Sequence, residues 1–309
     1  MTLAQRRTLE AASEWLEQRE RGTLWAMRLV VLLATCLGRG PMRLVVRCIA
    51  LYYALFDRRA REASTLWLGT VLGNAPSFWQ VYRHILHFTQ VTLDRFFLLR
   101  GKIAPFEFSR RGNEYLEALA REKKGALLLG AHLGSFEALR AAGDEEAFPV
   151  HIVGHFANAK MINGLLEALN PKLASRVIHV GDDPLGLALS LRERIESGNM
   201  VALLGDRVGL NERNIEVEFF GRPARFPAGP FLLAAALRAP VYLVFGLYRE
   251  PRHYALHCEL FAERITLPRL DRQAALQAWV QAYAARLEHY AKSAPYNWFN
   301  FYDFWKRFP

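Results

Sequence analysis

Short apolar runs alternate with helix-like stretches from residue 125 onward, and this alternation constrains the fold more than any other feature. The apolar runs have the length of strands, and the stretches between them have helical spacing. The runs are GALLLGA, VHIVGHF, RVIHVG, MVALLGD and PVYLVFGLY, and the helical stretches are INGLLEALN, PLGLALSLRERIESG and GPFLLAAALRA. Strands that alternate with helices are typical of α/β folds. The sequence therefore predicts a central, mostly parallel sheet flanked by helices.

The N-terminal region predicts two apolar helices. LWAMRLVVLLATCLG (24–38) and MRLVVRCIALYYALF (42–56) are separated by RGP. Arginines interrupt both runs, so neither reaches the roughly 20 uninterrupted apolar residues that favour a spanning helix. Basic side chains at intervals suit a hairpin that lies in a membrane interface, and the polybasic DRRAR (57–61) follows it. A pair of buried core helices is the alternative.

The middle and the end of the chain show helical patterns and an aromatic tail. The stretch from Ser77, a candidate helix cap, to Gly101 has apolar residues at helical spacing. A last helix at about 272–292 precedes the tail APYNWFNFYDFW. The aromatic residues of the helix over 77–98 and of this tail either line an apolar groove or pack as core. We therefore expect an N-terminal helical, membrane-associating segment over residues 1–61 and a single α/β domain over residues 62–309.

The charge and the cysteines limit the partner classes. The formal net charge is +10 and the isoelectric point is near 9.7, which favours an acidic partner: nucleic acid, anionic lipid or an acidic carrier protein. The Lys and Arg residues are scattered and no recognition motif occurs, so we expect no nucleic acid. Cys36, Cys48 and Cys258 show neither metal-ligand spacing nor a disulfide framework, so we expect no metal.

The segment GALLLGAHLGSFEALR, residues 125–140, carries the clearest chemical signal. Ligands of parallel sheets bind beyond the carboxyl ends of the strands, which is where His132 follows an apolar run. Gly134 permits a sharp turn and Ser135 can cap the next helix. Glu137, in the first turn of that helix, is close enough to reach the imidazole. A carboxylate that holds one ring nitrogen makes the other a better base.

This spacing by itself leaves a structural interpretation open. A histidine at a strand end is often a structural group, and Glu137 also suits the positive end of a helix dipole. The His-Glu-x-x-His spacing of zinc proteases is absent, as is the Gly-x-Gly-x-x-Gly fingerprint of dinucleotide sites.

Several further motifs resemble a known superfamily in type and order. AHLGSFE, GDR (205–207), FFGRPARFPAGPFLLA (219–234) and APVYLVF (239–245) occur in the order seen in the lysophospholipid-acyltransferase-like superfamily. The chain resembles its lipid A lauroyl/myristoyl acyltransferase branch. It is most similar to members that begin with W-x-x-x-x-E-R-G, here WLEQRERG, and end in PYNWFNFYDFW. Such relatives are often encoded with aryl-polyene or other lipid-pathway enzymes of Gram-negative bacteria.

The resemblance implies a role for the residues of the first motif. His132 resembles the general base of the family and Glu137 its carboxylate partner. Glu137 stands where many superfamily members have Asp, and Ser135 stands where Asn is common, but the lipid A branch tolerates Glu. Ser135 is implied to contact substrate.

The resemblance also implies substrate-binding residues in the block FGRPARFPAGP: Gly221, Arg222, Arg225 and Pro227. Gly221 and Arg222 would shape the entrance for the acceptor or the thioester, and Arg225 would hold a phosphate of the acceptor or of a carrier phosphopantetheine. Pro227 would begin the turn that opens the helix FLLAAAL, whose free N–H groups would bind an anion. The alternative for Arg222 and Arg225 is two solvated charges in a loop.

Asp206 and Arg207 match a block that faces the site in relatives, and a structural ion pair is the alternative. The oxyanion of the reaction needs hydrogen-bond donors. Backbone N–H groups near Gly134 and the guanidinium groups of Arg207 or Arg225 are the candidates.

The resemblance implies transfer of an acyl group from a thioester to a hydroxyl or amine of a membrane lipid or glycolipid. The co-substrate is acyl-acyl carrier protein or acyl-coenzyme A, and no other cofactor is expected. The expected partners are acyl carrier protein and anionic lipid, at the cytoplasmic face of the bacterial inner membrane. A lipid esterase or thioesterase, and a non-catalytic scaffold of the same fold, are the alternatives.

Overall fold

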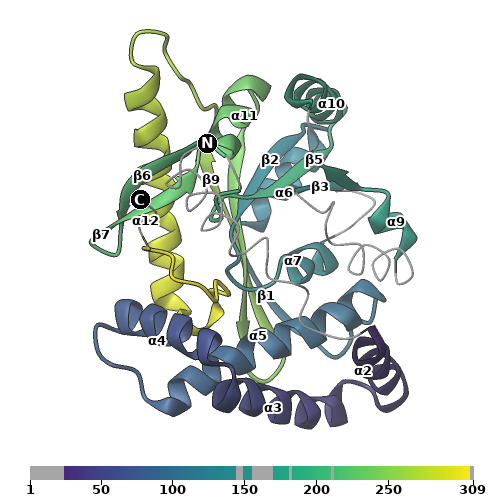
Figure 1. Ribbon diagram of the computed structural model, residues 1–309. Coiled ribbons are helices and arrows are strands. Elements are labelled where there is room, and N and C mark those ends of the chain that lie inside the picture. Colours follow the sequence, from purple (N-terminus) through teal and green to yellow (C-terminus); the bar gives the residue numbers. More distant parts are fainter. Residues whose placement is uncertain (1–23, 144–148, 155–169, 181–182, 210–211, 307–309) are drawn as a thin grey trace. The chain divides into compact units, whose positions relative to one another are not determined.

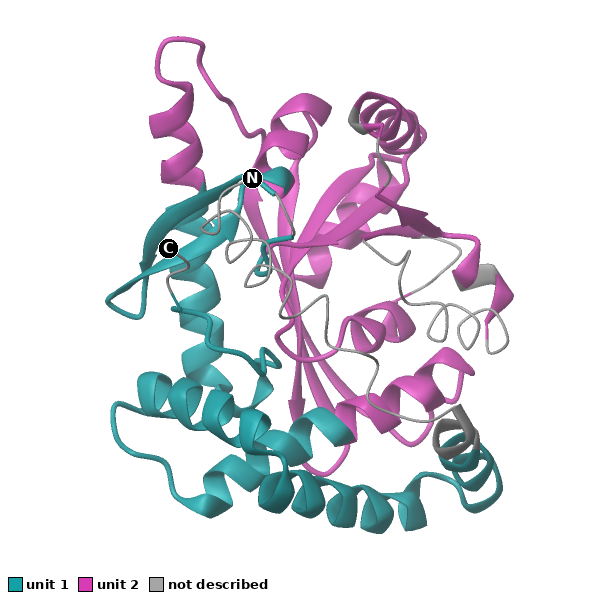
Figure 2. Cartoon of the chain, in the orientation of Figure 1, with its two compact units in different colours: residues 1–89, 206–229, 280–309 teal, residues 90–205, 230–279 magenta. Residues whose placement is uncertain are grey.

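The computed structural model describes most of the chain as two compact units. The described residues are 24–143, 149–154, 170–180, 183–209 and 212–306. Unit 1 comprises residues 1–89, 206–229 and 280–309, and unit 2 comprises residues 90–205 and 230–279 (Figure 2). Helices α5 (Phe78–Leu99) and α12 (Arg272–Ser293) contribute residues to both units.

Unit 2 contains a seven-stranded sheet with the strand order β1-β9-β8-β2-β5-β3-β4 (Figure 1). Neighbouring strands run parallel, except that β8 and β9 are antiparallel. The strands are β1 (Glu107–Arg111), β2 (Ala126–Gly130), β3 (Val150–Gly154), β4 (Val177–His179), β5 (Met200–Leu204), β8 (Val241–Arg249) and β9 (His253–Ala262). The predicted mostly parallel sheet is confirmed, and each of the five apolar runs forms a strand.

Strands β1 and β9, which lie at one side of this sheet, were not predicted from the sequence. The segment EFSRR of β1 is mostly polar because β1 is an edge strand with largely exposed side chains. Pairing with β9 fixes it as a strand, and that pairing joins segments far apart in the chain.

Helices pack against the sheet of unit 2 and bury its apolar residues. Helix α6 packs against β9, α7 against β8 and β9, and α10 against β5. Leu128 of β2 belongs to a core cluster to which α6 contributes Leu119 and α7 contributes Phe136 and Leu139. The helices are α6 (Asn113–Arg121), α7 (Phe136–Ala142), α9 (Pro171–Ala174), α10 (Pro184–Glu196) and α11 (Gly229–Leu237). The predictions of α10 and α11 are confirmed, whereas INGLLEALN lies outside the described residues except for Asn170.

Unit 1 combines helices with a two-stranded antiparallel sheet. Its elements are α2 (Leu24–Leu37), α3 (Arg39–Phe56), α4 (Arg58–Leu72), β6 (Asn214–Phe219), β7 (Arg222–Pro227) and the 3₁₀ turn η1 (Pro295–Asn297). Both predicted apolar helices form, and Ser77 caps α5 by accepting from the Gln80 N–H over 3.3 Å. Within the described ranges, no helix is both long and apolar enough to cross a membrane.

The predicted domain boundary after residue 61 falls inside α4. A separate membrane-associating segment over residues 1–61 stays a prediction, and the element WLEQRERG lies outside the described residues.

An aromatic cluster forms the core of unit 1 around the C-terminal tail. The rings of Trp67 and Trp298 lie 4.4 Å apart between centroids, and those of Phe219 and Phe226 lie 5.4 Å apart. The Trp305 indole N–H donates to the Phe219 carbonyl over 3.2 Å. The core-packing alternative therefore applies to these tail residues: Trp298 and Trp305 are buried.

Candidate active site

The turn between β2 and α7 is shaped by two glycines in close contact. Gly134 has φ +79° and forms an isolated parallel bridge with Gly246 of β8. A Cβ on Gly134 would lie 2.1 Å from the Gly246 carbonyl oxygen, and a Cβ on Gly246 would lie 2.3 Å from the Ser135 carbonyl oxygen. Both positions therefore require glycine. The predicted sharp turn at Gly134 is confirmed.

Ser135 stabilises the start of α7. Its Oγ accepts a hydrogen bond from the Ala138 N–H over 3.1 Å, and its own N–H donates to the Gly246 carbonyl over 2.7 Å. The predicted helix cap is confirmed. With 2% of its surface exposed, Ser135 holds the turn in place; its predicted contact with substrate stays a prediction.

His132 and Glu137 lie on either side of this turn. His132 is half-buried and follows β2 directly beyond its carboxyl end, whereas Glu137 is buried in the first turn of α7. The carboxylate of Glu137 forms an ion pair with the guanidinium of Arg95 from α5. Arg140, one turn further along α7, lies in the field of the same carboxylate. Burial lowers the pKa of Arg140, and the charge of Glu137 partly offsets this effect.

Arg95 was missed by the sequence analysis, although the sequence contains a signal. Asp94 and Arg95 are adjacent charges in the apolar second half of α5, where charged residues need partners. Asp94 is fully buried and accepts hydrogen bonds from the Tyr254 hydroxyl over 2.9 Å and the Gln90 amide over 3.1 Å. Arg95 pairs instead with Glu137. Only the tertiary fold tells which partner each charge takes.

The other predicted site residues belong to unit 1, where Asp206 and Arg207 bind the C-terminal tail. Asp206 Oδ2 accepts from the Trp298 indole N–H and from the Asn300 amide, each over 3.0 Å. Arg207 donates to Asn300 Oδ1 over 2.7 Å and to the Phe299 carbonyl over 3.0 Å. Asp206 has no exposed surface, and burial lowers the pKa of Arg207. These contacts make the pair a structural anchor for the tail.

Gly221, Arg222, Arg225 and Pro227 lie in or beside the β6–β7 hairpin, not in an open loop. Gly221, with φ +69°, is in the two-residue turn. Arg222 stacks on the Trp305 ring at 4.7 Å from its centroid, and Arg225 lies opposite Glu216 with a nitrogen–oxygen distance of 3.9 Å. Pro227 is buried at the end of β7. The roles of these residues toward substrate stay predictions.

A carboxylate of the chain itself lies at the start of α11. The resemblance implied that the free N–H groups of this helix would bind an anion, and that role stays a prediction. A Cβ on Gly229, the first residue of α11, would lie 2.6 Å from Glu212 Oε1. The carboxylate of Glu212 thus lies at this helix N-terminus, where it provides the negative charge that the dipole favours. An external anion would have to displace it.

The buried cysteine Cys258 lies in β9. Burial raises the pKa of the Cys258 thiol to about 12, so it stays protonated. In the part of the chain that the structure describes, no three metal-ligating side chains gather at one place.

Nearly the whole chain matches a known protein family. The family model described as bacterial lipid A biosynthesis acyltransferase matches residues 16–307, nearly the whole chain. No curated protein matches the sequence significantly.

Proposed function

The chain belongs to the bacterial lipid A biosynthesis acyltransferase family, and we propose that it transfers a fatty or polyene acyl group from acyl-acyl carrier protein to a hydroxyl or amine of a membrane lipid or glycolipid. The family implies acyltransferase activity in general, with acyl donors and lipid acceptors as its substrate classes. The observation that carries the proposal is the position of the two residues: half-buried His132 directly follows the carboxyl end of β2, and Glu137 is buried in the first turn of the next helix, α7. A base with a nearby carboxylate is what acyl transfer to an alcohol requires.

In the proposed reaction, His132 removes the proton of the acceptor hydroxyl as its oxygen attacks the thioester carbonyl carbon. The new carbon–oxygen bond gives a tetrahedral oxyanion. The carbon–sulfur bond then breaks, and the imidazolium of His132 returns the proton to the leaving thiolate. Glu137 stabilises the imidazolium while it exists. No acyl-enzyme forms in this scheme.

Arg95 is a positioning residue in this proposal. Its ion pair with Glu137 fixes the carboxylate at the start of α7, close in sequence to the turn that carries His132. A buried carboxylate held by a cation loses little conformational freedom when the imidazolium forms. Arg95 therefore acts through Glu137 and not on the substrate.

For the oxyanion we propose backbone donors of the turn at Gly134. The guanidinium of Arg207 already donates to Asn300 and Phe299, and the Ser135 N–H already donates to Gly246. The other N–H groups of this turn are held in place by its fixed backbone. Donors that need no reorganisation during the reaction stabilise the oxyanion most.

We propose further that unit 1 binds the cytoplasmic face of the inner membrane through α2, α3 and the start of α5. These helices expose ten large apolar side chains: Leu29, Leu32, Leu37, Leu44, Leu51, Tyr52, Leu55, Phe56, Phe78 and Trp79. Large apolar side chains exposed in this number favour contact with a membrane interface or a protein partner. The net charge of +10 favours an anionic membrane and an acidic carrier protein alike.

The experiment is a thioester turnover assay on purified wild type, His132→Ala and His289→Ala. His289 is an exposed histidine of α12 and serves as the matched control. Acyl-acyl carrier protein and acyl-coenzyme A are offered as donors, with and without total membrane lipid extract, and products are identified by mass spectrometry. We expect lipid-dependent transfer that His132→Ala abolishes and His289→Ala retains.

Other outcomes would contradict the proposal. Release of free fatty acid that ignores added lipid would make the protein a hydrolase. Absence of turnover with every donor, including an aryl-polyene thioester, would favour the scaffold.

A further inference from the structure

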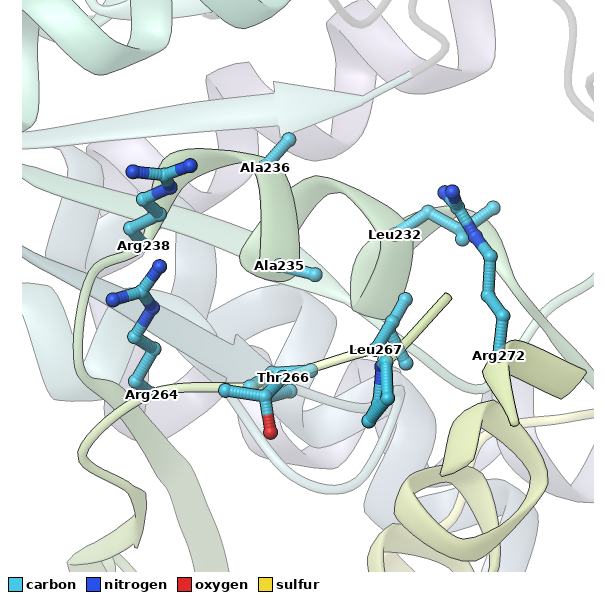
Figure 3. Close-up of a pocket in the computed structure, with 10 residues that line it drawn as sticks. Leu232, Ala235, Ala236, Arg238, Arg264, Thr266, Leu267 and Arg272 are labelled. Carbon is cyan, nitrogen blue, oxygen red and sulfur yellow. The ribbon is translucent and has the colours of Figure 1, made fainter. Parts of the chain in front are cut away.

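Unit 2 contains a pocket between α11 and the segment that follows β9. Its volume is about 390 Å³, which is within the range of small-molecule sites. Figure 3 shows its side chains coming from α11 and from the segment that leads into α12. The lining residues are Leu232, Ala235, Ala236, Arg238, Arg264, Ile265, Thr266, Leu267, Pro268 and Arg272.

This pocket and His132 lie at opposite ends of the strands of the sheet. Val241, the first residue of β8, pairs with Leu127 near the start of β2 and with Ala262 at the end of β9. The pocket is lined by residues just before β8 and just after β9, so it lies at the amino ends of the parallel strands. His132 lies beyond the carboxyl end of β2. The pocket is therefore separate from the proposed acyl-transfer centre.

The pocket combines an aliphatic lining with three positive charges. In the view of Figure 3, Arg238 and Arg264 lie at one side and Arg272 at the other, with Leu232 and Leu267 drawn between them. No carboxylate is among the ten lining residues. With the other described residues, the guanidinium groups of these three arginines form neither hydrogen bonds nor ion pairs. Other exposed arginines do pair; Arg252, for example, donates to Glu107.

The backbone at Arg238 adds an independent observation. Arg238 directly follows α11 and has φ +56°, the left-handed conformation that helix ends usually assign to glycine. A residue with a Cβ costs about 1 kcal/mol or more there. The chain thus places an arginine at a strained position in a pocket that two more arginines line.

We propose that this pocket is a second ligand site, which binds a phosphate group attached to a short aliphatic chain. Arg238 and Arg264, at one side of the pocket in Figure 3, would donate to the phosphate oxygens, since planar guanidinium forks suit that geometry, and Arg272 would add positive charge from the other side. Leu232, Leu267 and Ile265 would contact the chain. A phospholipid headgroup region and a soluble alkyl phosphate share this chemistry. The inference is independent of the proposed acyl transfer.

The test compares three probes on the purified full-length protein by isothermal titration calorimetry: hexyl phosphate, inorganic phosphate and hexanol. We expect hexyl phosphate to bind at least about tenfold more tightly than either of the others, because only it offers both groups. Phosphatidic acid in neutral vesicles, offered in a parallel arm, tells whether a membrane-held headgroup also binds. Hexyl phosphate binding without vesicle binding assigns a soluble ligand, and binding of both assigns a lipid.

The variants locate the site. Arg264→Gln/Arg272→Gln should weaken hexyl phosphate binding at least about tenfold. Arg269→Gln, an exposed arginine of the same segment outside the lining set, is the matched control and should bind as wild type. Arg238→Gly should weaken binding while keeping or raising the melting temperature, because glycine relieves the left-handed backbone. A structural role for Arg238 would instead lower that temperature.

A photoreactive hexyl phosphate, mapped by mass spectrometry, provides the second readout. We expect labelled peptides from α11 and from residues 264–272. Labelling elsewhere, equal affinity for inorganic phosphate or hexanol, or binding unaffected by the double variant would each overturn the proposal.

Discussion

The turn after β2 and the cluster around Asp206 contain the two most prominent motifs of the sequence, yet the fold uses them differently. At the turn, glycine contacts and a serine cap fix the backbone, while His132 remains half-exposed. At the cluster, Asp206 is buried and Arg207 is half-buried, and their side chains hold the C-terminal tail. A reacting group needs access to substrate. A buried polar group that holds the structure needs hydrogen-bond partners, because it has lost its contacts with water. Burial and hydrogen bonding thus distinguish the contacts observed at Asp206 and Arg207 from the exposure that the role proposed for His132 needs.

The largest expected effect is on stability, at Asp206. Asp206→Ala leaves the Trp298 indole N–H, the Asn300 amide and the Arg207 charge without their carboxylate, so we expect unfolding to become easier by about 3 kcal/mol or more. Asp206→Asn keeps an accepting oxygen and should lose less. Urea denaturation of both variants measures the difference. A stable Asp206→Ala protein that has lost only turnover would reverse the comparison and assign Asp206 to the active site.

The next effect is on turnover, at Glu137. Glu137→Gln removes the charge that stabilises the imidazolium, and we expect kcat to fall about 100-fold. Arg95→Gln, which only frees the carboxylate, should lower kcat about tenfold. Steady-state kinetics and thermal melts of both variants provide the measurement. Equal losses of stability without loss of kcat would make the Arg95–Glu137 pair purely structural.

The free energy of unfolding should depend on pH because of the buried histidine His84. Ser64 donates to His84 Nδ1 over 2.8 Å, and His84 Nε2 donates to the Trp298 carbonyl over 2.9 Å. Burial lowers the pKa of His84 to about 4. The unfolded chain takes up this proton near its ordinary pKa of about 6.5, so the free energy of unfolding falls as the pH drops from about 6.5 to 4.

Between pH 7.5 and pH 5 this loss should amount to about 2 kcal/mol. Denaturant unfolding at the two pH values measures it. His84→Gln should reduce the loss, whereas the exposed His289→Gln should leave it unchanged. An identical pH slope in His84→Gln would show that other groups set the pH dependence.

The smallest effect on stability is expected at the hairpin. The pair of Arg225 and Glu216 is partly exposed and has a 3.9 Å separation, so Arg225→Gln should change the free energy of unfolding by less than about 1 kcal/mol. Glu216→Gln breaks the same pair but keeps the cation. If Arg225 binds a substrate phosphate, only Arg225→Gln raises KM. Equal KM values in both variants would leave Arg225 a surface charge.

The sequence by itself determined the local features of this protein. The five apolar runs became strands, the stretch after Pro227 became α11, and the turn at Gly134 with its Ser135 cap formed as expected. Such features depend on residues close together in the sequence. The hydrophobic period, the turn residues and the capping groups can therefore be identified from the sequence. The resemblance in motif order likewise agreed with the family match.

The tertiary structure alone decided which charges meet. Arg95 pairs with Glu137, and Asp206 accepts from Trp298 and Asn300, although these partners lie far apart in the sequence. Glu212 lies at the start of α11. The partner of a charge is set by which side chains packing brings together away from water, where leaving a charge unpaired costs most. The pairing of β1 with β9 likewise joins segments that lie far apart in the sequence.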